Sequence, residues 1–405
     1  MTSSWRDLPS HRSWLDAESR GLLAFARGAR SERGFGWLGD DGAPVAGRAQ
    51  PLWITARFTH VFALGALMGI PGSAGLCDHG LTALTEDFAD PDHGGWFAEL
   101  QDGGAGRADK EAYGTAFVIL ALSSATLAGR PGARVALHQA LEITERYFWR
   151  EDEGACCESW DRSWRVCEAY RGANANMHMV EAFLAAADAL DDPAWLVRGF
   201  RISERLIHHE ARRRDWRVVE HFDERWRPQP DYNVEVKDHP FRPFGVTPGH
   251  GFEWARLLIA LRGRLDAPPA WMLEAAEGLF ARAAADGWGA GGGFVYTTDF
   301  AGAAVIEQRL HWVVAEAIGA AAALHESTGA ASYEDWYRRA WNFADAHLAD
   351  RANGSWRHEL NSDLSPAAGT WSGKPDVYHA FQATLIPRAS PAGSLAGALQ
   401  RQGLK

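Results

Sequence analysis

Residues 242–258 read RPFGVTPGHGFEWARLL, and the way this stretch folds decides how the rest of the chain is interpreted. The prolines and glycines of its first half are incompatible with a helix or a central strand, so an irregular loop is predicted there. From Phe252 onward the sequence favours a helix with an apolar face. His250 is then expected where the loop meets the helix. Glu253 follows near the same face, and its carboxylate is expected to orient the imidazole of His250.

The chain repeats a pattern of a turn-rich aromatic stretch, a polar loop and a helix. Glycine at the turn and alternating aromatic residues predict short hairpins at residues 34–37, 94–97, 154–160, 216–226, 291–294 and 354–356. The helices after them are expected to begin near Thr55, Ala112, Ala175, Phe252, Leu310 and Val377. Amphipathic second helices are expected at residues 133–148, 194–208, 271–285 and 333–347.

Six such helical hairpins predict an all-α fold, a closed (α/α)6 barrel with short β-hairpins in the loops at one end. An open α-solenoid is the alternative. The long hairpin loops always fall at the same end of the unit, which favours the barrel because they can then wall a single pocket. No linker interrupts the chain, so residues 1–405 are predicted to form a single barrel domain. The tail from Ser390 onward is expected to pack loosely.

The composition excludes several classes of partner. A net charge of −11 argues against nucleic acid or an anionic membrane. The four cysteines have no metal-ligand spacing and are expected to be reduced thiols in a cytosolic protein. The sequence has no signal-peptide pattern and no apolar run long enough to span a membrane, so a cytoplasmic location is expected.

In a closed barrel the N-terminal turns of the inner helices meet at one mouth, together with their positive dipole ends. The sequence places these side chains there: Trp53, Arg57, His60, Tyr113, Asn174, His178, His250, Glu253, Arg309, His311, Trp312, Asp376 and His379. Each alone has an ordinary interpretation as a surface charge, an acidic helix start or a core histidine. As a group they indicate a site, because buried polar groups cost free energy unless they are paired or used. No HExxH, HxH or clustered-carboxylate spacing occurs, so no metal is expected.

The same residues carry a resemblance to a known family. Residues 55–61, 174–182, 247–254, 311–317 and 373–380 are similar to the N-acylglucosamine 2-epimerase superfamily, within its aldose–ketose isomerase branch. The resemblance implies an (α/α)6 barrel without a metal or nucleotide cofactor. It also implies two essential histidines, His250 and His379. Matches that line the sugar site in that family are Arg57, Asn174, His178 and Glu253, with Trp53, Tyr113 and Trp312 as pocket walls.

The segment that ends in His379 is most similar to the members of that branch that isomerise mannose or sulfoquinovose. The implied reaction is the interconversion of D-mannose and D-fructose through a cis-enediolate, whose charge Arg57 would stabilise with help from His178 and Asn174. We expect His250 to move the carbon proton and His379 to open the sugar ring, although the reverse division fits the sequence equally well. The expected partner is a monosaccharide, bound by a monomer or a homodimer.

Other functions stay open at this point. Sulfoquinovose isomerisation and 2-epimerisation of an N-acylglucosamine or cellobiose would use the same scaffold. A glycoside hydrolase or lyase would need paired carboxylates in the mouth, for which Glu253 and Asp376 are the candidates. Such an enzyme would leave the histidines without a task. A non-catalytic sugar-binding or scaffold protein is the other alternative.

Overall fold

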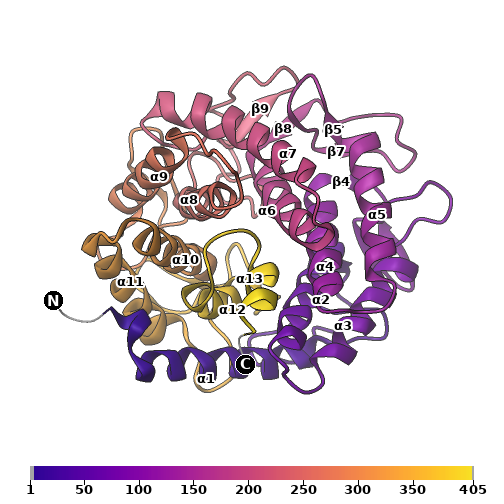
Figure 1. Cartoon of the computed structure of the whole chain (residues 1–405), viewed down its shortest axis with the longest axis horizontal. Helices are drawn as coiled ribbons and strands as arrows, with labels where there is room; N and C mark the ends of the chain where they lie inside the picture. The colour runs from indigo at the N-terminus through magenta and orange to yellow at the C-terminus, as the bar shows by residue number, and fades with distance from the viewer. Residues whose placement is uncertain (1–3, 404–405) are drawn as a thin grey trace.

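Two concentric rings of helices form the protein in the computed structural model, which describes residues 4–403 (Figure 1). The inner ring consists of α2 (Leu52–Leu67), α4 (Ala112–Leu127), α6 (Ala173–Leu190), α8 (Pro248–Arg262), α10 (His311–Thr328) and α12 (Tyr378–Leu385). The outer ring consists of α3 (Ser73–Thr82), α5 (Ala133–Ile143), α7 (Ala194–Ser203), α9 (Trp271–Gly287), α11 (Ala331–Phe343) and α1 (Pro9–Ala26). Because α1 packs on α12, the first helix completes the sixth pair and closes the ring. The predicted (α/α)6 barrel is confirmed.

The inner helices are buried on nearly every side, since they lie between the outer ring and the centre of the barrel. In α2, for example, all residues from 52 to 65 are buried, including Arg57 and His60. An apolar helix without a polar face is the expected sequence for such a position. No helix among the described residues is long and apolar enough to cross a bilayer.

The prediction that an irregular loop extends to Phe252 is wrong, because α8 begins at Pro248. Proline is tolerated in the first turn of a helix, where its missing N–H would have no partner within the helix. His250 therefore lies inside the first turn of α8 rather than before it. The other inner helices begin within three residues of their predicted starts.

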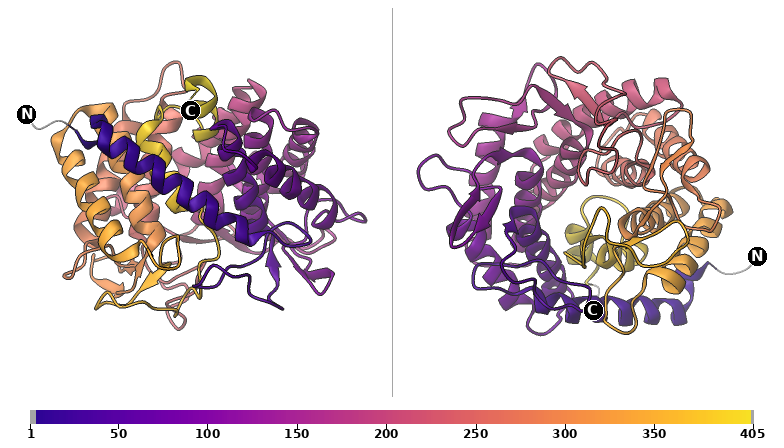
Figure 2. Two further views of the ribbon diagram at one scale, coloured as in Figure 1. Left: turned by 90° about the horizontal axis from the view of Figure 1, so that it is seen from below. Right: turned by 180° about the vertical axis from the view of Figure 1, so that it is seen from behind.

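A strand that immediately precedes an inner helix pairs with the next hairpin in four of the repeats. The pairs are β1 (Gln50–Pro51) with β2 (Glu99–Gln101), β4 (Lys110–Glu111) with β7 (Ser159–Trp160), β8 (Tyr170–Gly172) with β9 (His221–Asp223), and β12 (Arg309–Leu310) with β13 (Glu359–Leu360). In each of these repeats the first backbone amide of the inner helix donates a hydrogen bond to the backbone carbonyl of the residue just before the second strand. Those acceptors are the carbonyls of Ala98, Glu158, Glu220 and His358. The hairpins therefore gather at one end of the barrel (Figure 2).

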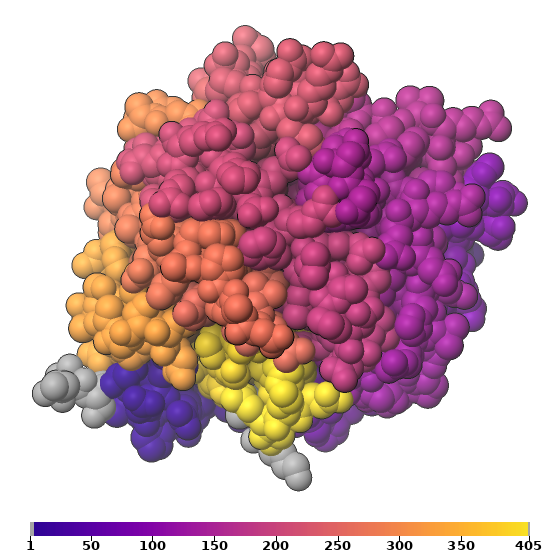
Figure 3. All heavy atoms as spheres, turned by 45° about the horizontal axis from the view of Figure 1, so that its top comes forward, coloured from indigo at the N-terminus to yellow at the C-terminus, as the bar shows by residue number. Residues whose placement is uncertain are grey.

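The C-terminal tail is ordered, in contrast to the loose packing expected from its composition. Helix α13 (Leu395–Gln402) is capped by the Ser394 hydroxyl, which accepts a hydrogen bond from the Gly397 amide at 3.1 Å. It packs on α2, α4 and α6 at the end of the barrel opposite the hairpins (Figure 2). In Figure 3 the C-terminal residues, coloured yellow, fill the surface between the neighbouring segments. This end is thus covered, and the hairpin end is the one that offers a pocket.

Replacing Gly80 with Ala should destabilise the fold by about 2 kcal/mol, the usual cost of overpacking a core. A Cβ atom at Gly80 would lie 2.0 Å from Thr59 Oγ1 and 2.9 Å from Phe35, so α3 would be forced away from α2. Gly75→Ala on the same helix is the matched control, since its Cβ atom meets nothing within 4 Å. Urea unfolding should show Gly75→Ala equal to or slightly more stable than the wild type. Equal stability of the two variants would contradict the tight contact between α2 and α3.

Candidate active site

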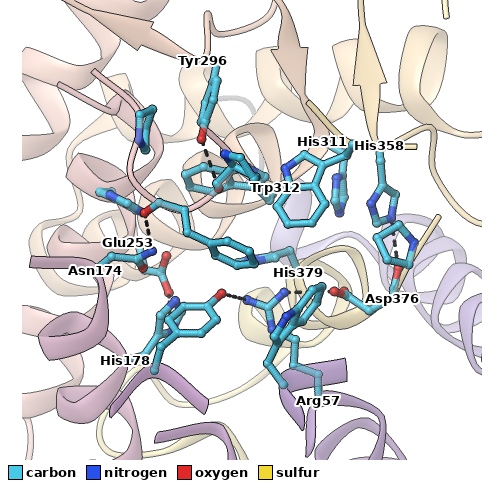
Figure 4. Close-up of a pocket in the computed structure, with 18 residues that line it drawn as sticks. Arg57, Asn174, His178, Glu253, Tyr296, His311, Trp312, His358, Asp376 and His379 are labelled. Carbon is cyan, nitrogen blue, oxygen red and sulfur yellow. Dashed lines mark hydrogen bonds and ion pairs between the residues drawn. The ribbon is translucent and has the colours of Figure 1, made fainter. Parts of the chain in front are cut away.

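The pocket lies where the N-terminal turns of the inner helices meet under the hairpins. All nine site residues predicted from the sequence line it: Trp53, Arg57, Tyr113, Asn174, His178, His250, Glu253, Trp312 and His379. Figure 4 shows these side chains converging from different helices. Phe241, from the loop before α8, covers the pocket edge-to-face against Tyr113, with ring centroids 5.3 Å apart. A wider cavity of about 750 Å³ adjoins the pocket and shares Phe241 and Trp371 with it.

His250 is held by a glutamate from the hairpin that precedes α8. Its Nδ1 lies 2.9 Å from both carboxylate oxygens of Glu220, and the two residues are 7% and 4% exposed. Because a carboxylate accepts, Nδ1 is the donor, and Nε2 of the neutral ring is left as a base for the pocket.

The predicted pairing of Glu253 with His250 is wrong. Residues three apart on an α-helix are neighbours, so the spacing permits a contact without fixing one, and Nδ1 of His250 is bonded to Glu220 instead. The Glu253 carboxylate lies instead 3.7 Å from Nδ1 of His178 and 3.7 Å from the guanidinium of Arg256.

His379 has the same arrangement as His250 but a less available carboxylate. Its Nδ1 lies 2.9 Å from Glu316, whose other oxygen accepts from Nε of Arg256 at 3.0 Å. Burial, and then the nearby charge of Arg57, lowers the pKa of His379 well below its usual range. Burial raises the pKa of Glu316 although Arg256 opposes the shift. His379 is therefore neutral at physiological pH and carries a positive charge less readily than a solvent-exposed histidine.

Trp312 contacts both histidines. Its ring centroid lies 5.3 Å from that of His250 and 5.8 Å from that of His379. The indole can occupy this place only because residue 249 is glycine, since a Cβ atom there would lie 2.3 Å from Cζ3 of Trp312. The apolar ring is thus a wall of the pocket that both imidazoles share.

Arg57 is fixed at the pocket wall with hydrogen-bond donors to spare. Its Nη1 donates to Asp376 and its Nη2 to the Tyr113 hydroxyl, both at 2.9 Å. Its Nε has no partner among residues 4–403. Asp376 also accepts the Tyr378 amide at 2.9 Å and so satisfies the first amide of α12. A guanidinium held in this way can donate to an oxyanion without reorganising.

A charged network lies against the inner side of the pocket. Arg256 Nη2 lies 3.6 Å from Glu181 and 3.7 Å from Glu253, and Tyr378 donates a hydrogen bond to Glu181. Burial, and then Glu316, raises the pKa of Glu253 well above its usual range. A protonated Glu253 reduces the excess of negative charge around the single guanidinium.

This network contains the one cluster of described residues with metal-like spacing. Potential ligand atoms of His178, Glu181 and Glu253 lie within 4.8 Å of one another. The cluster was not visible in the sequence because it joins α6 to α8. The guanidinium of Arg256 already supplies the positive charge to both carboxylates and would compete with a metal ion for them.

Two of the residues expected at the mouth do not line the pocket, and several others were missed. His60 is buried in α2 with Nδ1 on the Ser124 hydroxyl at 2.8 Å, and Arg309 donates to Gly292. The missed side chains are Glu220, Glu316, His358 and Phe241. Glu220 and His358 share one register position of the repeat, just before the second strand of a hairpin. That register was the only signal that could have found them.

Comparisons with known proteins agree with this geometry. Residues 34–383 match the family N-acylglucosamine 2-epimerase (GlcNAc 2-epimerase). The chain is 52% identical over 404 residues to the D-mannose isomerase of Thermobifida fusca, covering 98% of this chain and 99% of the relative. It is 48% identical over 406 residues to the D-mannose isomerase of Pseudomonas cannabina pv. alisalensis, covering 98% and 97%. A crystal structure of D-mannose isomerase aligns with a TM-score of 0.87 at 30% identity, covering 94% of this chain and 99% of that one.

Replacing His60 with Gln should make stability less sensitive to acid. Burial lowers the pKa of His60 to about 4, against about 6.5 in an unfolded chain. The unfolded chain therefore takes up a proton first, and stability that is complete near pH 7 is lost as the pH falls from about 6.5 to 4. Between pH 7 and pH 5, urea unfolding should show the variant losing about 2 kcal/mol less than the wild type.

The exposed His93 provides the control for this measurement. His93→Gln should keep the pH dependence of the wild type. A His60→Gln variant that also kept it would contradict a neutral, buried His60.

Proposed function

We propose that this protein, which belongs to the N-acylglucosamine 2-epimerase family, interconverts D-mannose and D-fructose. The observation that carries the proposal is the pair of buried histidines that both contact Trp312, each held at Nδ1 by a glutamate. Two bases that face one small pocket beside an arginine suit proton transfer next to a carbonyl group. The names of the relatives at 52% and 48% identity support mannose as the substrate.

The reaction begins with opening of the sugar ring, when a histidine transfers a proton between the anomeric hydroxyl and the ring oxygen. A histidine then removes the proton from C2, and the electrons of that bond move to form a C1–C2 double bond with negative charge on O1. Arg57 is placed to donate to this oxygen. The proton returns to C1 and the O2 hydroxyl proton passes to O1, which leaves the ketone at C2. No electrons are gained or lost overall.

The two glutamates favour His250 as the base for the carbon proton. Both carboxylate oxygens of Glu220 contact His250, whereas one oxygen of Glu316 contacts His379 and the other contacts Arg256. A carboxylate that is not shared stabilises the imidazolium better. His379 is neutral beside the charge of Arg57, so its Nε2 is better suited to the brief proton exchange of ring opening, in which it accepts the anomeric hydroxyl proton and passes it to the ring oxygen.

The remaining expectations belong to the same proposal. The described residues of the barrel act as one catalytic domain, and we extend this to residues 1–405. The protein works in the cytoplasm as a monomer or homodimer, without a metal or nucleotide cofactor.

Incubation with D-mannose in D2O, with and without EDTA, tests the function directly by NMR. We expect fructose in both samples, with deuterium at C1 if the enediolate exchanges its proton with solvent. His250→Asn and His379→Asn should each lower kcat by about 100-fold or more. Glucose without fructose would replace the proposal by 2-epimerisation. Turnover of sulfoquinovose without turnover of mannose would mean that sulfoquinovose is the substrate. Loss of activity in EDTA would contradict the metal-free mechanism.

Replacing Glu220 with Gln should lower kcat about 100-fold with little change in KM, because an amide can donate to Nδ1 and so leave the proton on Nε2. The matched control is Glu158→Gln. Glu158 occupies the same position in the preceding hairpin, where its carbonyl accepts the first amide of α4, but no histidine contacts its carboxylate among the described residues. Steady-state kinetics should show the control within about threefold of the wild type. Equal losses in both variants would mean that Glu220 acts only through the fold.

A further inference from the structure

His311 is a pocket residue to which the mechanism gives no task. It is the first residue of α10, and its backbone amide donates to the His358 carbonyl at 3.0 Å. Its ring stacks on that of His358, with centroids 3.7 Å apart and an interplanar angle of 26° (Figure 4). The ring of His379 lies 6.2 Å away in an edge-on orientation. Both His311 and His358 line the pocket.

The stacking partner of His311 is rigid. Nε2 of His358 donates to the Asp376 carbonyl at 3.0 Å, so its proton and its ring plane are both fixed. Burial lowers the pKa of His358 to about 3, so the ring is neutral at physiological pH. His311 is therefore held on one ring face by His358 and through its backbone by the hairpin.

The imidazole of His311 is buried without a hydrogen bond to its ring. The residue is 4% exposed, and neither ring nitrogen has a partner with hydrogen-bond geometry among residues 4–403. Burial, then the neighbouring His358 and His379, lowers the pKa of His311 well below its usual range, although the charge of Asp376 and the His358 carbonyl oppose this shift. A neutral imidazole carries one donor and one acceptor. Leaving both unused costs free energy comparable to lost hydrogen bonds, which a ligand would recover.

The direction of His311 differs from that of the catalytic groups. Consecutive residues of a helix point about 100° apart, so His311 faces the pocket from another side than Trp312, whose indole contacts both His250 and His379. The carbons that react must lie between those two histidines. The part of the sugar that remains for His311 is the hydroxyl-bearing chain beyond C2. A hydroxyl group can donate to the acceptor nitrogen or accept from the donor nitrogen of a neutral imidazole, so it can bind whichever ring nitrogen it reaches.

We propose that His311, oriented by His358, binds a hydroxyl group at C3, C4 or C6 of the sugar and so selects the substrate. This inference rests on the proposed function, because it places C1 and C2 between His250 and His379. His311 touches the substrate without taking part in proton transfer, and His358 is a positioning residue.

The test combines His311→Phe with deoxy sugars. Phe keeps a flat ring for stacking on His358 and removes both nitrogens. Kinetics are measured for D-mannose and its 3-deoxy, 4-deoxy and 6-deoxy forms. We expect His311→Phe to raise KM for mannose about tenfold or more, with a smaller effect on kcat. For the one deoxy sugar that lacks the bound hydroxyl, wild type and variant should have KM values within about twofold of each other.

Two further variants separate binding from a structural role. His311→Asn restores a donor and an acceptor and should recover part of the affinity. His325→Phe, near the C-terminal end of the same helix and away from the pocket, should leave KM unchanged. An equal rise in KM for all four sugars, or no rise for mannose, would overturn the proposal.

Failure of the proposed function gives a different result. If the wild type does not convert mannose, binding of D-mannose is measured by NMR titration instead. Binding that weakens about tenfold in His311→Phe would then keep His311 as a sugar-binding residue while the isomerase proposal fails. Binding that is unchanged in the variant would overturn the role of His311.

Discussion

The hydrogen bond from Nδ1 of a buried histidine to a glutamate is the interaction on which this site depends. A carboxylate brought into a barrel of apolar helices must be paired, since an isolated buried charge costs several kcal/mol. His250 and Glu220 meet this requirement for each other, as do His379 and Glu316. The pairing leaves Nε2 of each ring facing the pocket. The hydrogen bond that allows the barrel to bury these groups thus also leaves Nε2 of each histidine available for proton transfer.

The barrel supplies the partners through a regular feature of its repeats. In four repeats the first amide of an inner helix donates to the residue before the second strand of the next hairpin. That position is Ala98, Glu158, Glu220 or His358 in the units of α2, α4, α6 and α10, respectively. The backbone contact closes the helix N-terminus, and the side chain at the same position is free to differ. One repeat uses it to hold His250 and another to stack on His311.

Much of the fold could be predicted from the sequence because its period is long and its helices are strongly apolar. The start of α8 was predicted four residues late, since Pro248 and Gly249 look like a loop although both are compatible with the first turn. Gly249 is needed there for the contact with Trp312 rather than for a turn. The tail from Ser390 was misread because small residues, taken for a flexible segment, allow α13 to pack closely on three helices.

The sequence predicted the pocket-lining residues well but not the contacts between them. Eleven of the thirteen residues taken from helix starts line the pocket, because the topology brings every inner N-terminus to one place; His60 and Arg309 do not. The partner of His250 was assigned to Glu253 from sequence proximity, but spacing along one helix gives a direction and cannot reveal a carboxylate on a distant hairpin. Glu316 lies within a segment that resembles the family, yet nothing in its spacing links it to His379, which is 63 residues away.

A crystal structure with D-mannitol, an open-chain analogue without a carbonyl group, would test the central claim most directly. The two ends of D-mannitol are equivalent, so the account predicts that one of them lies between His250 and His379. Nε2 of each ring should be within hydrogen-bond distance of an oxygen at that end, and Arg57 should donate to one of its two terminal oxygens. Glu220 and Glu316 should remain bonded to Nδ1 of their histidines. A mannitol molecule with neither end between the two histidines, or a complex in which either Nδ1 has turned away from its glutamate, would contradict it.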